Sequence, residues 1–188
     1  LGYPDPRGRH ELRTSLAAYL GRTRSVRTDP DGVHLVGGFA AGLGFLGQLF
    51  ARIGCGRIAV EDPMLFFHRD ILRTSGVEVV PIPVDAEGIQ AERLDGVDVD
   101  AVLVTPSNQH PLGVTMAPER RVGLLEWARS TDSWIIEDDY DGEFRYDRKS
   151  IGSLQGLDPS RVIYAGTASK SLVPGLRIGW LVVPAELR

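Results

Sequence analysis

Lys170 is the residue of this sequence best placed to do chemistry. It ends a hydroxyl-rich run, Thr167-Ala168-Ser169-Lys170, that directly follows the apolar residues 161–166, and Arg177 comes seven positions later. An amine can form a Schiff base with an aldehyde cofactor, while hydroxyl groups and a guanidinium can hold a phosphate. The run therefore predicts that Lys170 binds a phosphorylated aldehyde and that Thr167, Ser169 and Arg177 bind its phosphate. Taken alone, it also fits an exposed lysine in a loop, which is the commoner setting for lysine.

Three consecutive carboxylates, Glu137, Asp138 and Asp139, follow the apolar residues 134–136, and Tyr140 comes next. Such a run fits a solvated turn. Metal ligation is a second alternative, although hard cations usually take oxygen ligands spaced around a loop. A third interpretation agrees with Lys170: Asp138 points inward and pairs with a protonated pyridine nitrogen, so that the ring can accept electrons from a neighbouring carbanion. Tyr140 would then hydrogen-bond the phenolic oxygen of the same ring.

Polar residues also follow the apolar residues 101–105. The segment 106–113 contains two prolines and ends in glycine, a composition typical of a rigid turn. Either Asn108 or His110 could reach a ring oxygen of a cofactor, and a structural turn with solvent-facing amides is an equal alternative. His110 as a catalytic base would need a partner that the sequence does not identify.

Gly37 and Gly38 stand between the apolar residues 33–36 and an expected helix. Glycines at such a junction let the backbone approach a phosphate, which the helix dipole favours, so this turn predicts the second half of the phosphate site. Residues 42–47 also read GxGxxG, with Asp62 twenty positions after the first glycine, which is the form of a dinucleotide fingerprint. Because Gly42 lies inside the expected helix rather than directly after the strand, NAD binding is only a secondary alternative, and close helix packing would also explain these glycines.

Apolar runs typical of buried strands alternate with helical patterns along the chain. This alternation predicts an α/β fold, a three-layer sandwich with a mostly parallel sheet that binds its ligand at the carboxyl ends of the strands. The expected strands are 33–36, 57–60, 77–82, 101–105, 134–136, 161–165 and 178–183, and the expected helices are 8–20, 40–53, 66–75, 118–130 and a short one at 91–94.

Composition restricts the class of protein. The 188 residues are 43% hydrophobic and 24% charged with a net charge of -4, which fits one domain over residues 1–188 without the basic surface of a nucleic-acid binder. Cys55 is the single cysteine, so no internal disulfide and no cysteine metal site is expected. No apolar run is long enough to span a bilayer, and a cytoplasmic location is expected. The chain begins without Met, so we expect it to be part of a larger protein.

Five segments of the sequence together closely resemble the aminotransferase-like domain of MocR-type regulators in the GntR superfamily, which is similar to fold-type I, class I/II aminotransferases. In chain order these are Gly2-Tyr3-Pro4-Asp5-Pro6-Arg7-Gly8, Glu61-Asp62-Pro63, Thr105-Pro106-Ser107-Asn108-Gln109-His110-Pro111-Leu112-Gly113, Ile136 to Tyr146, and Gly166-Thr167-Ala168-Ser169-Lys170. The resemblance implies the large pyridoxal 5'-phosphate-binding domain, with Lys170 as the Schiff-base lysine and Asp138, Tyr140, Thr167, Ser169 and Arg177 in the roles given above.

The resemblance is incomplete at two places. Gly38-Phe39-Ala40 matches the phosphate-binding turn of the family only in part, since a polar pair is common there, so backbone N–H groups must contribute more. Leu65 stands near the position of a ring-stacking tyrosine, and it can pack on a ring but cannot stack as an aromatic, unless Phe66 or Phe67 takes over.

For the whole protein, the resemblance implies a homodimer, in which Tyr3 reaches the phosphate of the neighbouring subunit. It also implies a preceding winged helix-turn-helix, through which alone DNA would be bound, and a following small domain that grips the carboxylate of an amino-acid ligand. Two functions remain open: an effector-sensing regulator that binds an amino acid or amine, and an aminotransferase acting between an amino acid and a 2-oxo acid.

Overall fold

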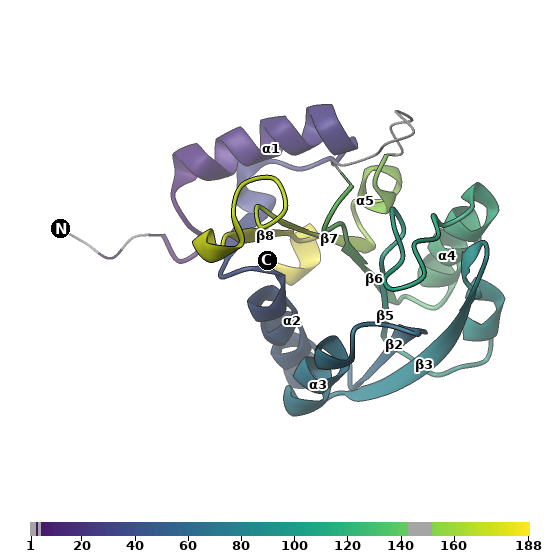
Figure 1. Cartoon of the computed structure of the whole chain (residues 1–188). Helices are drawn as coiled ribbons and strands as arrows, with labels where there is room; N and C mark the ends of the chain where they lie inside the picture. The colour runs from purple at the N-terminus through teal and green to yellow at the C-terminus, as the bar shows by residue number, and fades with distance from the viewer. Residues whose placement is uncertain (1–2, 4, 143–151) are drawn as a thin grey trace.

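The computed structural model of the chain describes residue 3, residues 5–142 and residues 152–188, and Figure 1 shows how its elements are arranged. Gly2 and Pro4 of the N-terminal motif, and residues 143–146 of the motif that contains Asp138, lie outside the described residues.

A mixed sheet of eight strands forms the middle of the molecule, in the order β1-β8-β7-β6-β5-β2-β3-β4. The central strands β7, β6, β5, β2 and β3 are parallel, whereas β8 is antiparallel to both of its neighbours and β4 is antiparallel to β3. The expectation of a mostly parallel sheet is therefore confirmed. The strands are β1 Val33–Val36, β2 Arg57–Asp62, β3 Glu78–Asp85, β4 Gly88–Ile89, β5 Ala101–Val104, β6 Trp134–Asp138, β7 Val162–Thr167 and β8 Gly179–Val182.

Helices cover both faces of this sheet, as Figure 1 shows. On one face, Leu43 of α2 and Leu72 of α3 share a core cluster with Ile136 of β6. On the other face, Leu124 of α4 shares a cluster with Ile135, the neighbouring residue of the same strand. Because successive residues of a strand point to opposite faces, the two clusters are the two cores of a three-layer sandwich. The helices are α1 His10–Arg24, α2 Phe39–Ile53, α3 Phe66–Thr74, α4 Pro118–Ser130 and α5 Leu154–Leu157.

The predicted strands and helices each correspond to an observed element, with ends that differ by a few residues. The expected short helix at 91–94 is the 3₁₀ segment Ala91–Leu94; the other 3₁₀ segments are Pro30–Gly32, Pro174–Leu176 and Ala185–Leu187. Strand β4 and helix α5 were not expected. Within the described residues, no helix combines the length and apolar character needed to cross a membrane.

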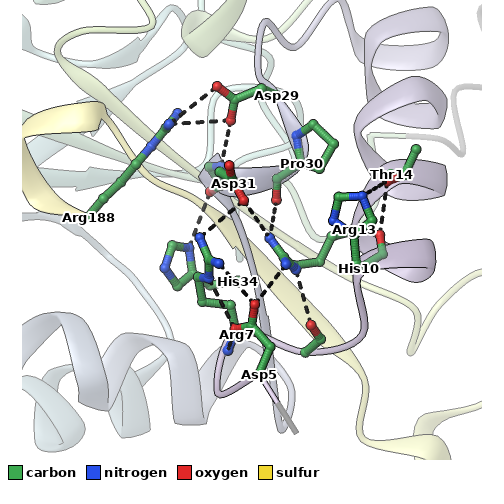
Figure 2. A network of polar contacts seen from close by, with 12 residues as sticks. Asp5, Arg7, His10, Arg13, Thr14, Asp29, Pro30, Asp31, His34 and Arg188 are labelled. Carbon is green, nitrogen blue, oxygen red and sulfur yellow. Dashed lines mark hydrogen bonds and ion pairs between the residues drawn. The ribbon is translucent and has the colours of Figure 1, made fainter.

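Helix α1 lies over the β1 end of the sheet, where Leu20 is buried against Tyr164 and Val182. Its first turn carries Arg13, whose side chain is only 2% exposed. The Arg13 guanidinium donates hydrogen bonds to Asp5 Oδ2 (2.9 Å), to the carbonyl oxygen of Pro30 (2.7 Å) and to Asp31 Oδ1 (3.2 Å), as Figure 2 shows. These contacts fix the chain that precedes α1 against the turn that leads into β1.

The GxGxxG glycines lie within α2, and neighbouring elements explain two of them. A side-chain carbon at Gly42 would lie 3.3 Å from Leu181 and Val36 of the sheet, and one at Gly47 would lie 2.7 Å from Cβ of Ser75, just after α3. These glycines thus allow α2 to pack closely on the sheet and on α3, and the motif does not form the strand-to-helix turn of a dinucleotide site.

Candidate functional site

The carboxyl ends of the parallel strands meet at one edge of the sheet, where a cavity of about 300 Å³ opens beside the start of α2. Most of the residues singled out from the sequence line it, although they come from five separate segments. Those lining residues are Phe39, Ala40, Leu65, His110, Asp138, Tyr140, Thr167, Ser169, Lys170 and Arg177.

The three consecutive carboxylates point alternately to the two faces of the sheet, so they have different surroundings. Glu137 accepts hydrogen bonds from the backbone N–H groups of Leu154 (2.9 Å) and Gln155 (3.0 Å), at the start of α5. Asp139 forms a two-pronged ion pair with Arg24 of α1, at 2.6 and 3.0 Å. Asp138 points to the opposite face and lines the cavity. All three side chains are buried, so the solvated turn is wrong. The three carboxylates also have separate surroundings and do not converge on one point.

Asp138 is the residue of the run that lacks a partner. It is 4% exposed, and its Oδ1 atom has no hydrogen-bond partner among the residues that the structure describes. Burial, and then the charges of Asp139, Glu61 and Asp141, raise the pKa of this carboxyl well above its ordinary value. A buried acceptor of this kind at the edge of a cavity fits a cationic N–H of a ligand, which would pair with the carboxylate and favour its ionised form.

A second group of contacts forms a cradle for an anion. Gly38 has a φ of 89° and directly precedes α2, whose first turn has no side-chain cap, so its N–H groups face the cavity end. A side-chain carbon at Gly38 would lie 2.9 Å from Nη2 of Arg177, which itself donates to the carbonyl oxygen of Gly37 at 3.4 Å. Glycine thus leaves room for the guanidinium beside the helix start.

Hydroxyl groups complete the cradle from the opposite side. Thr167 ends β7, and its Oγ1 donates to Ser169 Oγ (3.0 Å) and accepts the backbone N–H of Ser169 (3.1 Å). This turn leads into Lys170, which lines the same cavity and keeps an exposed side chain. The arrangement brings an amine, two hydroxyls, a guanidinium and free helix N–H groups to one place, which suits an aldehyde that carries a phosphate.

Tyr140 and Asn108 form a pair at the side of the cavity. Asn108 Nδ2 donates to the Tyr140 hydroxyl (3.1 Å), and that hydroxyl donates to the carbonyl oxygen of Asn108 (3.1 Å). Burial, followed by the charges of Asp141 and Asp138, raises the pKa of Tyr140 above its ordinary value, so the phenol keeps its proton. Tyr140 therefore offers a hydroxyl, not a phenolate, to a ligand. The ring of His110 stands edge-on to it, 6.4 Å between centroids.

Three of the proposed residues do not line the cavity. Asn108 reaches it only through Tyr140, and Gly38 borders it beneath Arg177. Tyr3 is fully exposed and is not among the described residues that line this cavity. Nδ1 of His110 is buried without a partner in the described part of the chain, so the structure supplies no orienting group for a catalytic base.

Glu61 is a cavity residue that was not predicted to have a role. It is the penultimate residue of β2 and is buried, and it accepts hydrogen bonds from Thr105 Oγ1 (2.6 Å), Thr105 N (3.2 Å) and Gln109 Nε2 (3.2 Å). Burial raises its pKa to about 7, while these hydrogen bonds act in the opposite direction. Its position near the carboxyl end of a predicted strand, beside Asp62-Pro63, could have identified it as a residue of the site.

His68 and Phe67 of α3 also line the cavity, next to Leu65. The His68 ring is buried between Phe39 and Phe67, with centroid distances of 4.9 and 4.4 Å. Burial lowers the pKa of His68 to about 4. Phe67 lies in the wall beside Leu65, whereas Phe66 is exposed and outside it, so Phe67 is the better placed aromatic for contact with a ring.

Comparison with known proteins agrees with this geometry. The family model described as aminotransferase class I and II matches residues 1–188. The chain is 46% identical over 182 residues to the uncharacterized HTH-type transcriptional regulator YdeL of Bacillus subtilis, covering 96% of this chain and 39% of that protein. It is 39% identical over 189 residues to the probable rhizopine catabolism regulatory protein MocR of Rhizobium meliloti, covering 99% of this chain and 38% of that protein.

Solved structures give the same fold. The crystal structure of Pyrococcus horikoshii kynurenine aminotransferase, in complex with PMP, matches with a TM-score of 0.88 and 32% identity, over 100% of this chain and 48% of that one. The chain thus spans less than half the length of each of these three proteins. The resemblance to the aminotransferase-like domain of MocR-type regulators is confirmed, and the chain belongs to the class I and II aminotransferase family.

Proposed function

We propose that this chain is the pyridoxal 5'-phosphate-binding, aminotransferase-like effector domain of a MocR/GntR-type transcription regulator. The observation that carries the cofactor assignment is Asp138 Oδ1, a buried acceptor without a partner among the described residues, in one cavity with Lys170 and an anion cradle. When bound, pyridoxal phosphate supplies an aldehyde that condenses with amines and a ring that accepts electrons released next to it.

The residues of the chain would divide the work of binding. Lys170 would bind the aldehyde carbon through its amine, and Asp138 would accept the N–H of the ring nitrogen and hold it protonated. The cradle formed by the N–H groups of Phe39 and Ala40, by Thr167 and Ser169, and by Arg177 would hold the phosphate. The ring would lie against Leu65 and Phe67.

Two residues would orient the ring by its oxygen. The Tyr140 hydroxyl hydrogen, which Asn108 accepts in this structure, can rotate towards a ring oxygen while Asn108 Nδ2 still donates to the hydroxyl. This pair would therefore fix the ring in its plane without a change of protonation, since the phenol keeps its proton.

For the whole protein we propose an amino acid or amine as effector and a separate N-terminal module as the DNA-binding part, because the regulators YdeL and MocR are more than twice the length of this chain. A soluble homodimer in the cytoplasm, with Tyr3 of each subunit at the partner's site, fits the full exposure of Tyr3.

The lysine assignment has a direct test. The chain has two lysines, Lys149 and Lys170, so Lys149→Ala is a matched control for Lys170→Ala. In the whole protein, pyridoxal phosphate should produce a visible absorption band that Lys170→Ala abolishes and Lys149→Ala keeps. Borohydride reduction followed by mass spectrometry should place the cofactor on the peptide containing Lys170. A band that survives in Lys170→Ala would refute the assignment.

A class I/II aminotransferase is the second candidate function, and it is favoured by the likeness to the kynurenine aminotransferase structure. Lys170 and Asp138 would serve both functions. Incubating the whole protein with amino acids and a 2-oxo acid separates them: sustained release of the new 2-oxo acid supports the enzyme. Amino-acid-dependent DNA binding in a gel-shift assay without turnover supports the regulator.

A further inference from the structure

The ion pair between Arg24 and Asp139 lies directly behind the candidate cofactor carboxylate. Arg24 ends α1, and its side chain is 2% exposed while that of Asp139 is 1% exposed. Asp139 follows Asp138 in the chain but points to the other face of the sheet, away from the cavity. Among the described residues that line the cavity, neither Arg24 nor Asp139 is found, yet Arg24 holds the residue next to Asp138.

The same guanidinium joins two of the loops that form the site. Its Nη2 donates to Ser107 Oγ (2.7 Å), in the loop that carries Asn108, and its Nη1 donates to the carbonyl oxygen of Gly142 (3.0 Å). Asp139 also accepts the hydroxyl hydrogen of Tyr164 from β7, at 2.7 Å. One buried cation thus connects the loops that follow β5 and β6, and through Asp139 it is linked to β7.

The glycine at position 142 allows the backbone to lie directly against the ion pair between Arg24 and Asp139. A side-chain carbon at Gly142 would lie 2.1 Å from Asp139 Oδ1 and 2.5 Å from Arg24 Nη2. The backbone can pass over the ion pair only because residue 142 lacks a side chain.

Arg24 also affects the site through its positive charge. The negative charge of Asp139 acts on Asp138 and disfavours its ionised form. A guanidinium bound to both oxygens of Asp139 offsets that charge at its source. Without this cation, the uncompensated charge of Asp139 would lie beside Asp138, and an ionised Asp138 would be costly.

We infer that Arg24 is a positioning residue of the cofactor site: through Asp139, Ser107 and Gly142 it fixes the loops around the cavity, and its charge allows Asp138 to meet a ring nitrogen as a carboxylate. This inference rests on the proposed cofactor function. It assigns to α1, which contributes nothing to the cavity wall, a part in recognising one atom of the cofactor.

The test compares two probes in the whole protein: pyridoxal 5'-phosphate and its analogue in which the ring nitrogen is replaced by CH. The native protein should bind pyridoxal phosphate at least about tenfold more tightly than the analogue, the ratio expected for one charge-assisted hydrogen bond. Arg24→Met should reduce this ratio to about twofold or less, in addition to any loss of affinity that the loosened loops cause for both probes. A merely structural role would weaken both probes equally and leave the ratio unchanged.

Two further variants keep the inference falsifiable if Arg24→Met folds poorly. Arg24→Lys keeps the charge and should retain most of the ratio. The double variant with Arg24→Met and Asp139→Asn removes the uncompensated charge and should recover most of the ratio. Arg13→Met is the matched control, because Arg13 lies on the same helix, is equally buried and is ion-paired with Asp5 (Figure 2), and neither residue is among those that line the cavity. It should leave the ratio unchanged.

The outcomes separate the inference from the function on which it rests. If the native protein binds neither probe, or both equally, the proposed function or the role of Asp138 fails, and the inference fails with it. If the native protein shows the ratio and Arg24→Met keeps it, the cofactor function stands and the inference is overturned.

Discussion

Glu61→Gln is the substitution for which the structure gives the clearest prediction, because it replaces a buried carboxyl of the cavity with a group that does not titrate. Glu61 accepts hydrogen bonds from Thr105 and Gln109, and burial raises its pKa from 4.5 to about 7. The folded state therefore binds this proton more tightly than the unfolded state does. The stabilisation is fully present below about pH 4.5 and is lost as the pH rises to about 7.

The size of the effect follows from the same pKa values. The difference between 4.5 and about 7 corresponds to about 3 kcal/mol, since one pKa unit equals about 1.4 kcal/mol. Between about pH 5 and pH 7.5, the native protein should lose about 2 kcal/mol of unfolding free energy relative to Glu61→Gln. Any pH-independent cost of the glutamine cancels in this difference, and so do the titrations of Glu137 and His68, which both proteins share.

Urea unfolding of the cofactor-free whole protein at these two pH values, followed by circular dichroism, measures the difference directly. Glu61→Gln should be the less pH-sensitive protein in this range. If the two proteins lose stability in parallel between pH 5 and pH 7.5, Glu61 does not hold its proton in the folded state, and the account of the cavity electrostatics is refuted.

Further predictions concern His68 and the glycines of α2. Burial lowers the pKa of His68 from 6.5 to about 4, so its contribution to stability is lost as the pH falls from about 6.5 to about 4. His68→Phe should therefore reduce the loss of unfolding free energy over this pH range by about 3 kcal/mol, as urea unfolding can measure. An unchanged loss in the variant would contradict this prediction. Gly44→Ala, which meets only an ordinary contact at 3.7 Å, should raise the unfolding free energy by up to about 1 kcal/mol through helix propensity, as thermal unfolding can show. Gly47→Ala should lower it by about 1 kcal/mol because its side-chain carbon would lie 2.7 Å from Ser75, and the reverse order of the two variants would show that the α2–α3 contact is misjudged.

Much of the site could be predicted from the sequence because polar residues that follow buried parallel strands meet at one edge. Lys170, Asp138 and Tyr140 were singled out in this way, and the structure brings them to one cavity. The roles of these residues towards a cofactor stay predictions until the experiments above are made.

The sequence could not assign the three consecutive carboxylates in the same way. Strand alternation separates Asp138 from its neighbours, but the partner of Asp139 is Arg24, 115 positions earlier, and no local pattern connects the two. A run of like charges is typical of a solvated surface, and only the long-range partners make it a buried one.

Short elements were missed for a different reason. Strand β4 has two residues and helix α5 has four, so neither is long enough to produce a recognisable period. Helix α5 is defined instead by contacts: Ser153 Oγ accepts the N–H of Gly156, and Glu137 accepts two more N–H groups at its start. Predicting α5 would therefore have required the knowledge that Glu137 of strand β6 lies at the start of this helix.

Helix α1 is held by a buried arginine near each end, Arg13 to Asp5 and Arg24 to Asp139. These arginines are eleven positions apart, which is about 16 Å along a continuous hydrogen-bonded helix at about 1.5 Å per residue. Each arginine therefore anchors one end of the same rod, so α1 bridges two places of buried charge: the segment that contains Asp5, and Asp139 behind the carboxylate pocket.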